Sequence, residues 1–329
     1  MLAPADLVKI PCTPDLISSG ITCACRALSR PGAAAGREAT QRLRSIAAQA
    51  ATALAFRHHL DEQGIPFVIP RGFTAQVPED IPILLGGHRC LLQTSLISRA
   101  RQTDQMIRSP GALFQAPALL PMEGLEVAGN KPDDILLYAF LPGRVPASRT
   151  EMEQARTGGN PLRLIHPMPT AWARPSAWIP LNDLSMKSEC DQPITVDLLG
   201  VTASRDHFIR RLELPPRQRV AIHDELCAVT CLLVERPPEA RLGIHSPVRG
   251  EACLISPFDW SNLWIECTTI VLAGWLTRQN YLCRAAVLKG DQRTFPLDRP
   301  AGKSLAVPLK DLNPVAPLLR RVKTWAQGK

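Results

Sequence analysis

The 329-residue chain is long enough for two ordinary domains, and its 45% content of apolar residues excludes wholesale disorder. No apolar run approaches the roughly 20 residues of a membrane-spanning helix, so we expect no membrane partner. Lys and Arg number 38 and Asp and Glu number 30, which gives a net charge of +8.

The basic excess lies mainly at the C-terminal end of the chain. Residues 1–146 contain 14 basic and 12 acidic residues, whereas residues 284–329 contain 10 basic and only 3 acidic residues. A basic tail of this kind suits nucleic acid. A solubilising surface explains the same charge pattern equally well.

The ten cysteines are scattered along the chain and lack the paired CxxC spacing of a zinc site. Several stand within apolar runs, where cysteine behaves as a small core residue. Because the sequence also shows no secretory signal, we expect reduced thiols and a cytoplasmic location.

The N-terminal half predicts an α/β domain over residues 38–146, preceded by an irregular segment over residues 1–37. Helical and strand-like spacing of apolar residues identifies the elements of this domain. They are a helix (38–63), an edge strand (65–69), two strands (81–85 and 89–94) joined by the Gly86-Gly87 turn, a helix (95–108) and a strand (134–140). This pattern predicts a mixed sheet flanked by helices.

The C-terminal half predicts a second, β-rich domain over residues 183–329 that ends in the basic tail. Residues 147–182 are rich in Pro, Gly, Arg and Ser, which is typical of a connector. The predicted strands are 194–199, 228–234, 252–255, 263–272 and 305–309, and the predicted helices are 278–287 and 315–326.

The order of elements in the first domain carries a family resemblance. Two stretches contain it: Thr52-Ala-Leu-Ala-Phe-Arg-His-His-Leu-Asp-Glu-Gln-Gly-Ile-Pro66 and Asp80-Ile-Pro-Ile-Leu-Leu-Gly-Gly-His-Arg-Cys-Leu-Leu-Gln-Thr94. Over residues 38–140 the chain resembles the PD-(D/E)XK, or restriction-endonuclease-like, nuclease superfamily. The resemblance implies a hairpin that carries one acid before its turn and an acid-x-lysine triplet after it.

Phosphodiester hydrolysis by such nucleases needs a divalent cation, and Mg²⁺ prefers carboxylate oxygens and water. The resemblance matches Asp80 to the first acid, Leu91 to the second acid and Gln93 to the lysine. Leucine cannot bind a metal, so one ligand carboxylate of two remains, with Glu38 on the first helix as a further candidate ligand. If the chain is active, Asp80 and Gln93 are its catalytic residues. A surface acid at the start of a strand is the alternative interpretation of Asp80.

Two groups of basic residues are candidate DNA contacts. One group follows the third strand with only Asp104 opposing it, and the other lies in the basic tail. Such residues suit a track of phosphates, although an exposed helix face explains them too. The candidates are Arg99, Arg101 and Arg108 in the first group, and Arg320, Arg321 and Lys323 in the second.

These observations leave hypotheses of different classes. In the first, the chain binds DNA or a partner protein through a nuclease-like domain that is catalytically impaired or inactive, and Leu91 favours this interpretation. In the second, it is a Mg²⁺-dependent DNA endonuclease with an unusual site built on Asp80, Gln93 and Glu38. A structural accessory protein without nucleic-acid contact is a third.

Overall fold

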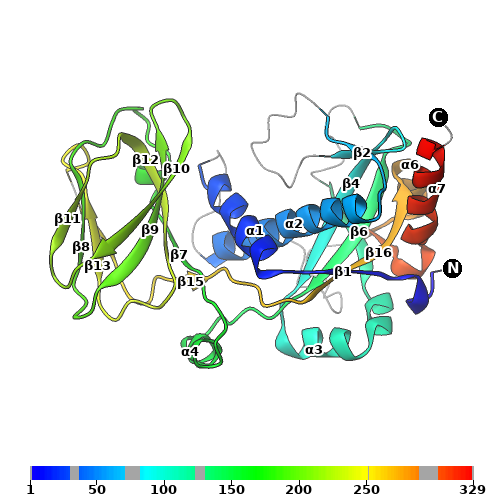
Figure 1. The fold of residues 1–329 in the computed structure, drawn as a ribbon, viewed down its shortest axis with the longest axis horizontal. Coiled ribbons are helices and arrows are strands. Elements are labelled where there is room, and N and C mark those ends of the chain that lie inside the picture. Colours follow the sequence, from blue (N-terminus) through cyan, green and yellow to red (C-terminus); the bar gives the residue numbers. More distant parts are fainter. Residues whose placement is uncertain are drawn as a thin grey trace. The chain divides into compact units, whose positions relative to one another are not determined.

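The computed structural model describes residues 2–29, 37–70, 82–122, 130–250, 252–288 and 303–327. The chain divides into two compact units, whose helices and strands are labelled in Figure 1. Unit 1 consists of Met1–Gly20, Ser45–Val145 and Ile265–Lys329, and unit 2 consists of Ile21–Arg44 and Pro146–Trp264. Each unit has a buried apolar cluster of its own.

The main sheet of unit 1 mixes parallel and antiparallel strands. Its strands in the described part of the chain are β1 (Val8–Pro11), β2 (Phe67–Val68), β3 (Ile83–Leu85), β4 (His88–Ile97), β6 (Ile135–Pro142) and β16 (Thr269–Thr277). Their order is β1-β16-β6-β4-β3-β2. β4 and β6 run parallel, and the other neighbours in this order are antiparallel. The expected mixed α/β fold is confirmed at this level.

Helices flank this sheet. α2 (Arg37–Glu62) lies across it in Figure 1. α3 (Ala100–Arg108) contributes Met106 to a buried cluster with Leu136 and Tyr138 of β6. The alternate residues Leu137 and Ala139 are buried too, so β6 is covered on both faces. No helix in the described ranges is long and apolar enough to cross a membrane.

The remaining elements of unit 1 surround the main sheet. They are η1 (Pro4–Asp6), η3 (Pro110–Gln115), β5 (Pro117–Pro121), α6 (Arg278–Arg284), β17 (Ala286–Leu288), β18 (Ser304–Pro308), η5 (Leu309–Asp311) and α7 (Val315–Gln327). β17, β18 and β5 pair in this order as a small antiparallel sheet. α7 buries Leu318, Leu319 and Val322, the face that its helical spacing predicts.

The Gly86-Gly87 turn forms as predicted. Both glycines have positive φ angles, 56° and 87°, as a two-residue hairpin turn between twisted strands requires. β3 and β4 pair from Leu85↔His88 to Ile83↔Cys90, which confirms the predicted pairing over this stretch. β4 then continues to Ile97, where a helix was predicted from residue 95, because its last residues pair with β6.

Residues 2–29 are not irregular, so the prediction of an irregular segment over residues 1–37 is wrong for this described part. β1 occupies an edge of the main sheet, and α1 (Pro14–Ala27) follows it. Tertiary packing overrides the weak local preference here, since Ile17, Ile21 and Cys25 are all buried. Gly20 lets α1 approach α2, because a Cβ at this position would stand 2.3 Å from the carbonyl oxygen of Ala47.

Unit 2 is β-rich. Its described strands are β7 (Leu164–Pro167), β8 (Leu184–Ser188), β9 (Ile194–Thr202), β10 (His207–Leu214), β11 (Arg219–Ile222), β12 (Leu226–Val234), β13 (Leu242–His245), β14 (Ala252–Ile255) and β15 (Ser261–Asn262). They form antiparallel sheets with orders β10-β9-β12-β7-β15 and β11-β8-β13-β14. Leu198 of β9 and Ile244 of β13 are fully buried in one cluster, as in a β-sandwich.

The units divide the chain differently from the predicted boundaries. Residues 147–182, predicted as a connector, contain α4 (Arg149–Thr157), β7 and α5 (Thr170–Ala173), and β7 pairs with β12 inside a sheet. Residues 265–329, predicted as part of the second domain, belong to unit 1. The reason is long-range strand pairing, because β16 lies between β1 and β6.

A disulfide joins Cys12 and Cys267, which corrects the expectation that all thiols are reduced. The two residues are 255 positions apart, and their Cα atoms are 6.1 Å apart. Pairing of β1 with β16 brings them together, since Cys12 follows β1 and its N–H donates to the carbonyl of Thr268. Such a distant pairing cannot be read from cysteine spacing.

The close approach at Gly20 predicts the effect of one added methyl group. Alanine normally stabilises a helix by about 1 kcal/mol relative to glycine. In Gly20→Ala, the clash with Ala47 should instead lower the free energy of unfolding by about 1–3 kcal/mol in urea denaturation. Gly111→Ala is the control, because its Cβ would meet nothing closer than 3.7 Å. A stabilised Gly20→Ala variant would contradict the packing of α1 on α2.

Candidate functional site

The face of β4 that carries Leu91 and Gln93 is the candidate active face. The parallel register with β6 sets Leu91 beside Leu136 and Gln93 beside Tyr138. Alternate residues of a strand share a face, so these side chains form one patch. The structure therefore brings together the two β4 positions that the family resemblance singled out.

Leu91 is a partly buried residue at the margin of the apolar core of unit 1. It packs against the buried cluster that contains Leu136, Tyr138 and Phe140 of β6 and Leu113 of η3. The position matched to the second acid of the nuclease motif thus lies against hydrocarbon. A carboxylate there would lose its hydration without gaining a partner from these residues.

On this face of β4, the described ionised group next to Leu91 is Arg89, two residues before it, and Arg89 is paired with Asp134. Burial raises the pKa of the Tyr138 phenol well above its ordinary value, so this hydroxyl stays protonated at neutral pH. Burial also raises the pKa of Cys90, on the other face of β4, to about 12. Within the described residues, no group of three or more His, Cys, Asp or Glu side chains could hold a metal ion.

Two predicted metal ligands cannot be placed against this face. Asp80 lies outside the described residues, and the side chain of Glu38, at the start of α2, does too. Among the described residues, Gln93 provides a polar side chain at the position that the resemblance matches to the lysine. Gln93 is half-buried.

Gln49 of α2 completes the hydrogen bonding of β4 beyond the hairpin. Its side-chain Nε2 donates to the carbonyl of Leu92 at 2.5 Å, and its Oε1 accepts from the N–H of Thr94 at 2.8 Å. A side-chain amide therefore makes the two bonds that a neighbouring strand would make. This contact ties α2 to the middle of β4, next to Gln93.

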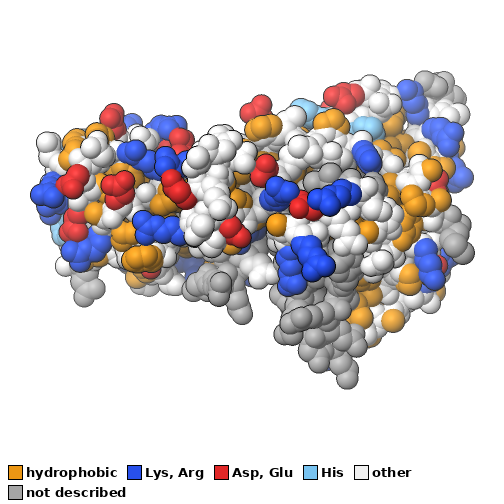
Figure 2. Space-filling model, turned by 90° about the horizontal axis from the view of Figure 1, so that it is seen from below, with side chains coloured by type: hydrophobic (Ala, Val, Ile, Leu, Met, Phe, Trp, Pro, Cys, Tyr) orange, Lys and Arg blue, Asp and Glu red, His pale blue; other side chains and the backbone are white. Residues whose placement is uncertain are grey.

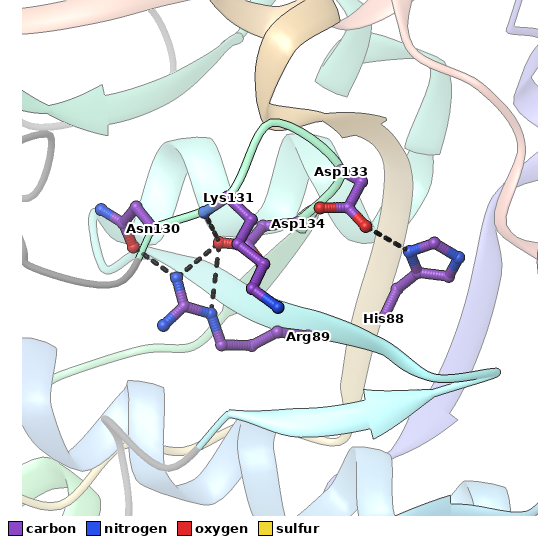
Figure 3. Close-up of polar contacts among 6 residues, drawn as sticks. All are labelled: His88, Arg89, Asn130, Lys131, Asp133 and Asp134. Carbon is purple, nitrogen blue, oxygen red and sulfur yellow. Dashed lines mark hydrogen bonds and ion pairs between the residues drawn. The ribbon is translucent and has the colours of Figure 1, made fainter.

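A buried ion pair fixes the start of β4 against the start of β6 (Figure 3). Oδ2 of Asp134 accepts hydrogen bonds from Nη2 of Arg89 at 2.5 Å, Nε of Arg89 at 3.2 Å and the N–H of Lys131 at 2.8 Å. Nη2 of Arg89 also donates to Oδ1 of Asn130 at 2.6 Å. The Asp134 side chain is only 2% exposed, and Arg89 is 18% exposed.

The neighbouring pair, His88 with Asp133, lies at the surface. Nδ1 of His88 is 3.1 Å from Oδ2 of Asp133, and both side chains are exposed. Sequence patterns by themselves do not indicate that Arg89 pairs with Asp134. The only available signal was the acidic pair Asp133-Asp134 directly before an apolar strand.

Two arginines of α3 and the arginine directly before this helix are exposed. Arg99, Arg101 and Arg108 are all exposed. Asp104, the acid that opposes them in sequence, pairs instead with Arg144, whose Nη2 lies 2.5 Å from Oδ1 of Asp104. The predicted basic character of this helix therefore persists in the folded chain.

The second basic group lies on α7, apart from α3 in Figure 1. Arg320 and Arg321 are exposed, and Lys323 donates from Nζ to the carbonyl of Gln63 at 2.6 Å. Lys323 thus also closes the end of α2, a structural role that its sequence position did not indicate. In Figure 2, Lys and Arg side chains reach the surface in separate places and do not form one continuous patch.

Comparisons with known protein families, with curated protein sequences and with solved structures found no match to this chain.

The Arg89–Asp134 pair predicts a large effect of removing one partner. Arg89→Leu leaves a buried carboxylate without its counter-ion, so it should lower the free energy of unfolding by about 3 kcal/mol. His88→Ala is the matched control one residue away, and its exposed pair should contribute well under 1 kcal/mol. Urea denaturation followed by circular dichroism measures both.

A double variant separates the ion pair from other effects. Arg89→Leu combined with Asp134→Leu removes both charges, so it should be more stable than Arg89→Leu alone. Equal losses of unfolding free energy in Arg89→Leu and His88→Ala would show that the buried pair does not hold β4 against β6.

Proposed function

We propose that the chain is a DNA-binding protein whose unit 1 is a nuclease-like domain without effective metal-dependent cleavage. The observation that carries this proposal is the environment of Leu91 on β4. The elements α2, β2, β3, β4, α3 and β6 follow in this order, with η3 and β5 between α3 and β6, and the sheet order β2-β3-β4-β6 includes a parallel β4–β6 pair; this arrangement supports the proposal. On that framework, a partly buried apolar residue that packs against the core stands where a metal ligand is needed.

The DNA-binding part of the proposal rests on charge. Arg99 directly before α3 and Arg101 and Arg108 within it are exposed, while Asp104 of α3 is paired with Arg144. α7 contains no acidic residue. Exposed guanidinium groups bind phosphate oxygens and make binding independent of base sequence. A protein partner that uses the same surface is the other binding role we consider.

An active endonuclease is the second candidate function, and it depends on Asp80 and Glu38 as metal ligands. Two such carboxylates beside Gln93 would be the residues that hold Mg²⁺, and the ion would activate water and neutralise phosphate charge. The cytoplasmic location stays a prediction. Disulfides such as Cys12–Cys267 are uncommon in reducing compartments. Fractionation of cells that contain the protein tests it.

DNA binding should be salt-dependent and should depend on the named arginines. Binding is measured by fluorescence anisotropy at several salt concentrations. The logarithm of the association constant should fall steeply and linearly with the logarithm of the salt concentration, with a slope near 0.9 per phosphate contact. Replacing Arg99, Arg101 and Arg108 by alanine should reduce that slope by about 2–3, and replacing Arg320, Arg321 and Lys323 should weaken binding to unrelated sequences alike.

A charge-matched control in unit 2 tests whether position matters. Arg156, Arg217 and Arg241 are exposed and paired with acids, and their triple alanine variant lowers the net charge by the same amount. It should bind DNA nearly as the unaltered protein does. No binding at low salt, or binding unaffected by salt, would refute the DNA-binding proposal.

The unaltered protein should not cleave duplex DNA above background in the presence of Mg²⁺, because Leu91 and Gln93 supply neither a carboxylate nor a cation. Leu91→Glu with Gln93→Lys should create measurable Mg²⁺ binding by calorimetry if the core tolerates two charges. Robust cleavage by the unaltered protein that Asp80→Ala abolishes would identify it as an endonuclease instead.

A further inference from the structure

An exposed aromatic side chain lies on α7 among its basic residues. Trp325 is 52% exposed, although it lies on a helix whose other large apolar residues are buried. The rest of its surface packs on the hairpin turn, since a Cβ on Gly86 would stand 3.2 Å from Cε3 and Cζ3 of the indole. The ring is thus supported from one side and open to solvent over about half of its surface.

The surroundings of Trp325 are basic. Arg321 precedes it by four residues, which places the two on neighbouring positions of one helix face. Lys323 is anchored to the carbonyl of Gln63, so the last turns of α7 are tied to the end of α2. α7 itself contains three basic residues and no acidic residue.

We propose that Trp325, with Arg321 beside it, is a stacking site for an unpaired base of single-stranded DNA. The inference rests on the proposed DNA binding and names the kind of DNA that α7 binds. An indole face stacks on any base, and adjacent cations hold the phosphates on either side, which is how sequence-tolerant single-strand binding works. A base inside a duplex presents no open face to such a ring, so duplex DNA would use only the charges.

The arrangement favours nucleic acid over an apolar partner. A hydrophobic docking surface needs several exposed apolar residues together, whereas the exposed residues that α7 places around Trp325 are charged or polar. The hairpin turn at Gly86 covers part of the indole of Trp325, so the ring is held in place before a ligand binds. Little side-chain freedom is then lost on stacking.

The experiment compares a thymidine oligonucleotide with a duplex of equal length, both labelled, by fluorescence anisotropy at low salt. Trp325→Leu keeps apolar cover on Gly86 but has no aromatic face. It should weaken binding of the single strand about tenfold, within the range of one stacked base, and should change duplex binding less than about twofold. Trp325→Phe keeps an aromatic face and should therefore keep most of the single-strand affinity. If Trp325 only filled space, phenylalanine would have no such advantage over leucine.

Intrinsic fluorescence gives a second readout. Unlabelled thymidine oligonucleotide should quench tryptophan emission of the unaltered protein, and Trp325→Leu should lose most of that quenching. Trp178→Leu is the matched control, because Trp178 is also partly exposed but stacks with Arg205 in unit 2. Thermal melting by circular dichroism checks that both variants are folded.

The outcomes separate this inference from the proposed function. Equal losses on single strand and duplex, or unchanged single-strand affinity in Trp325→Leu, overturn the stacking site while leaving DNA binding intact. Failure of the unaltered protein to bind either DNA overturns the proposed function itself.

Discussion

The parallel pairing of β4 with β6 is the constraint on which the rest of unit 1 depends. Parallel neighbours need a long crossover, and here the crossover contains α3, η3 and β5, which cover one face of the sheet. β6 is apolar over most of its length and wholly buried, so its side chains alone specify the register weakly. The buried Arg89–Asp134 pair at their common start specifies it by geometry and charge.

That pairing also decides the chemistry of the candidate site. It stacks Leu91 on Leu136 and Gln93 beside Tyr138, so packed apolar side chains and one amide stand on this face next to the Arg89–Asp134 ion pair. Exposed basic residues lie on the flanking helices α3 and α7.

Patterns over a few residues of the sequence predicted the elements that short-range interactions determine. The Gly-Gly turn follows from the positive φ angles of a tight hairpin, and α2 from its helical apolar spacing. The mixed sheet around the hairpin was predicted from the same signals. α1 was missed because its Ser, Gly and Cys content is weakly helical, and only burial of Ile17 and Ile21 against other elements makes it a helix.

By itself, the sequence determined the β3–β4 hairpin, the long helix before it and the apolar strand after it. These follow from turn chemistry, side-chain periodicity and residue identity, which act over a few positions. Only the tertiary structure decided that β16 joins the N-terminal sheet, that Cys12 meets Cys267 and that Arg89 pairs with Asp134. Those contacts join residues from 45 to 255 positions apart, and their free energy depends on burial that no local pattern records.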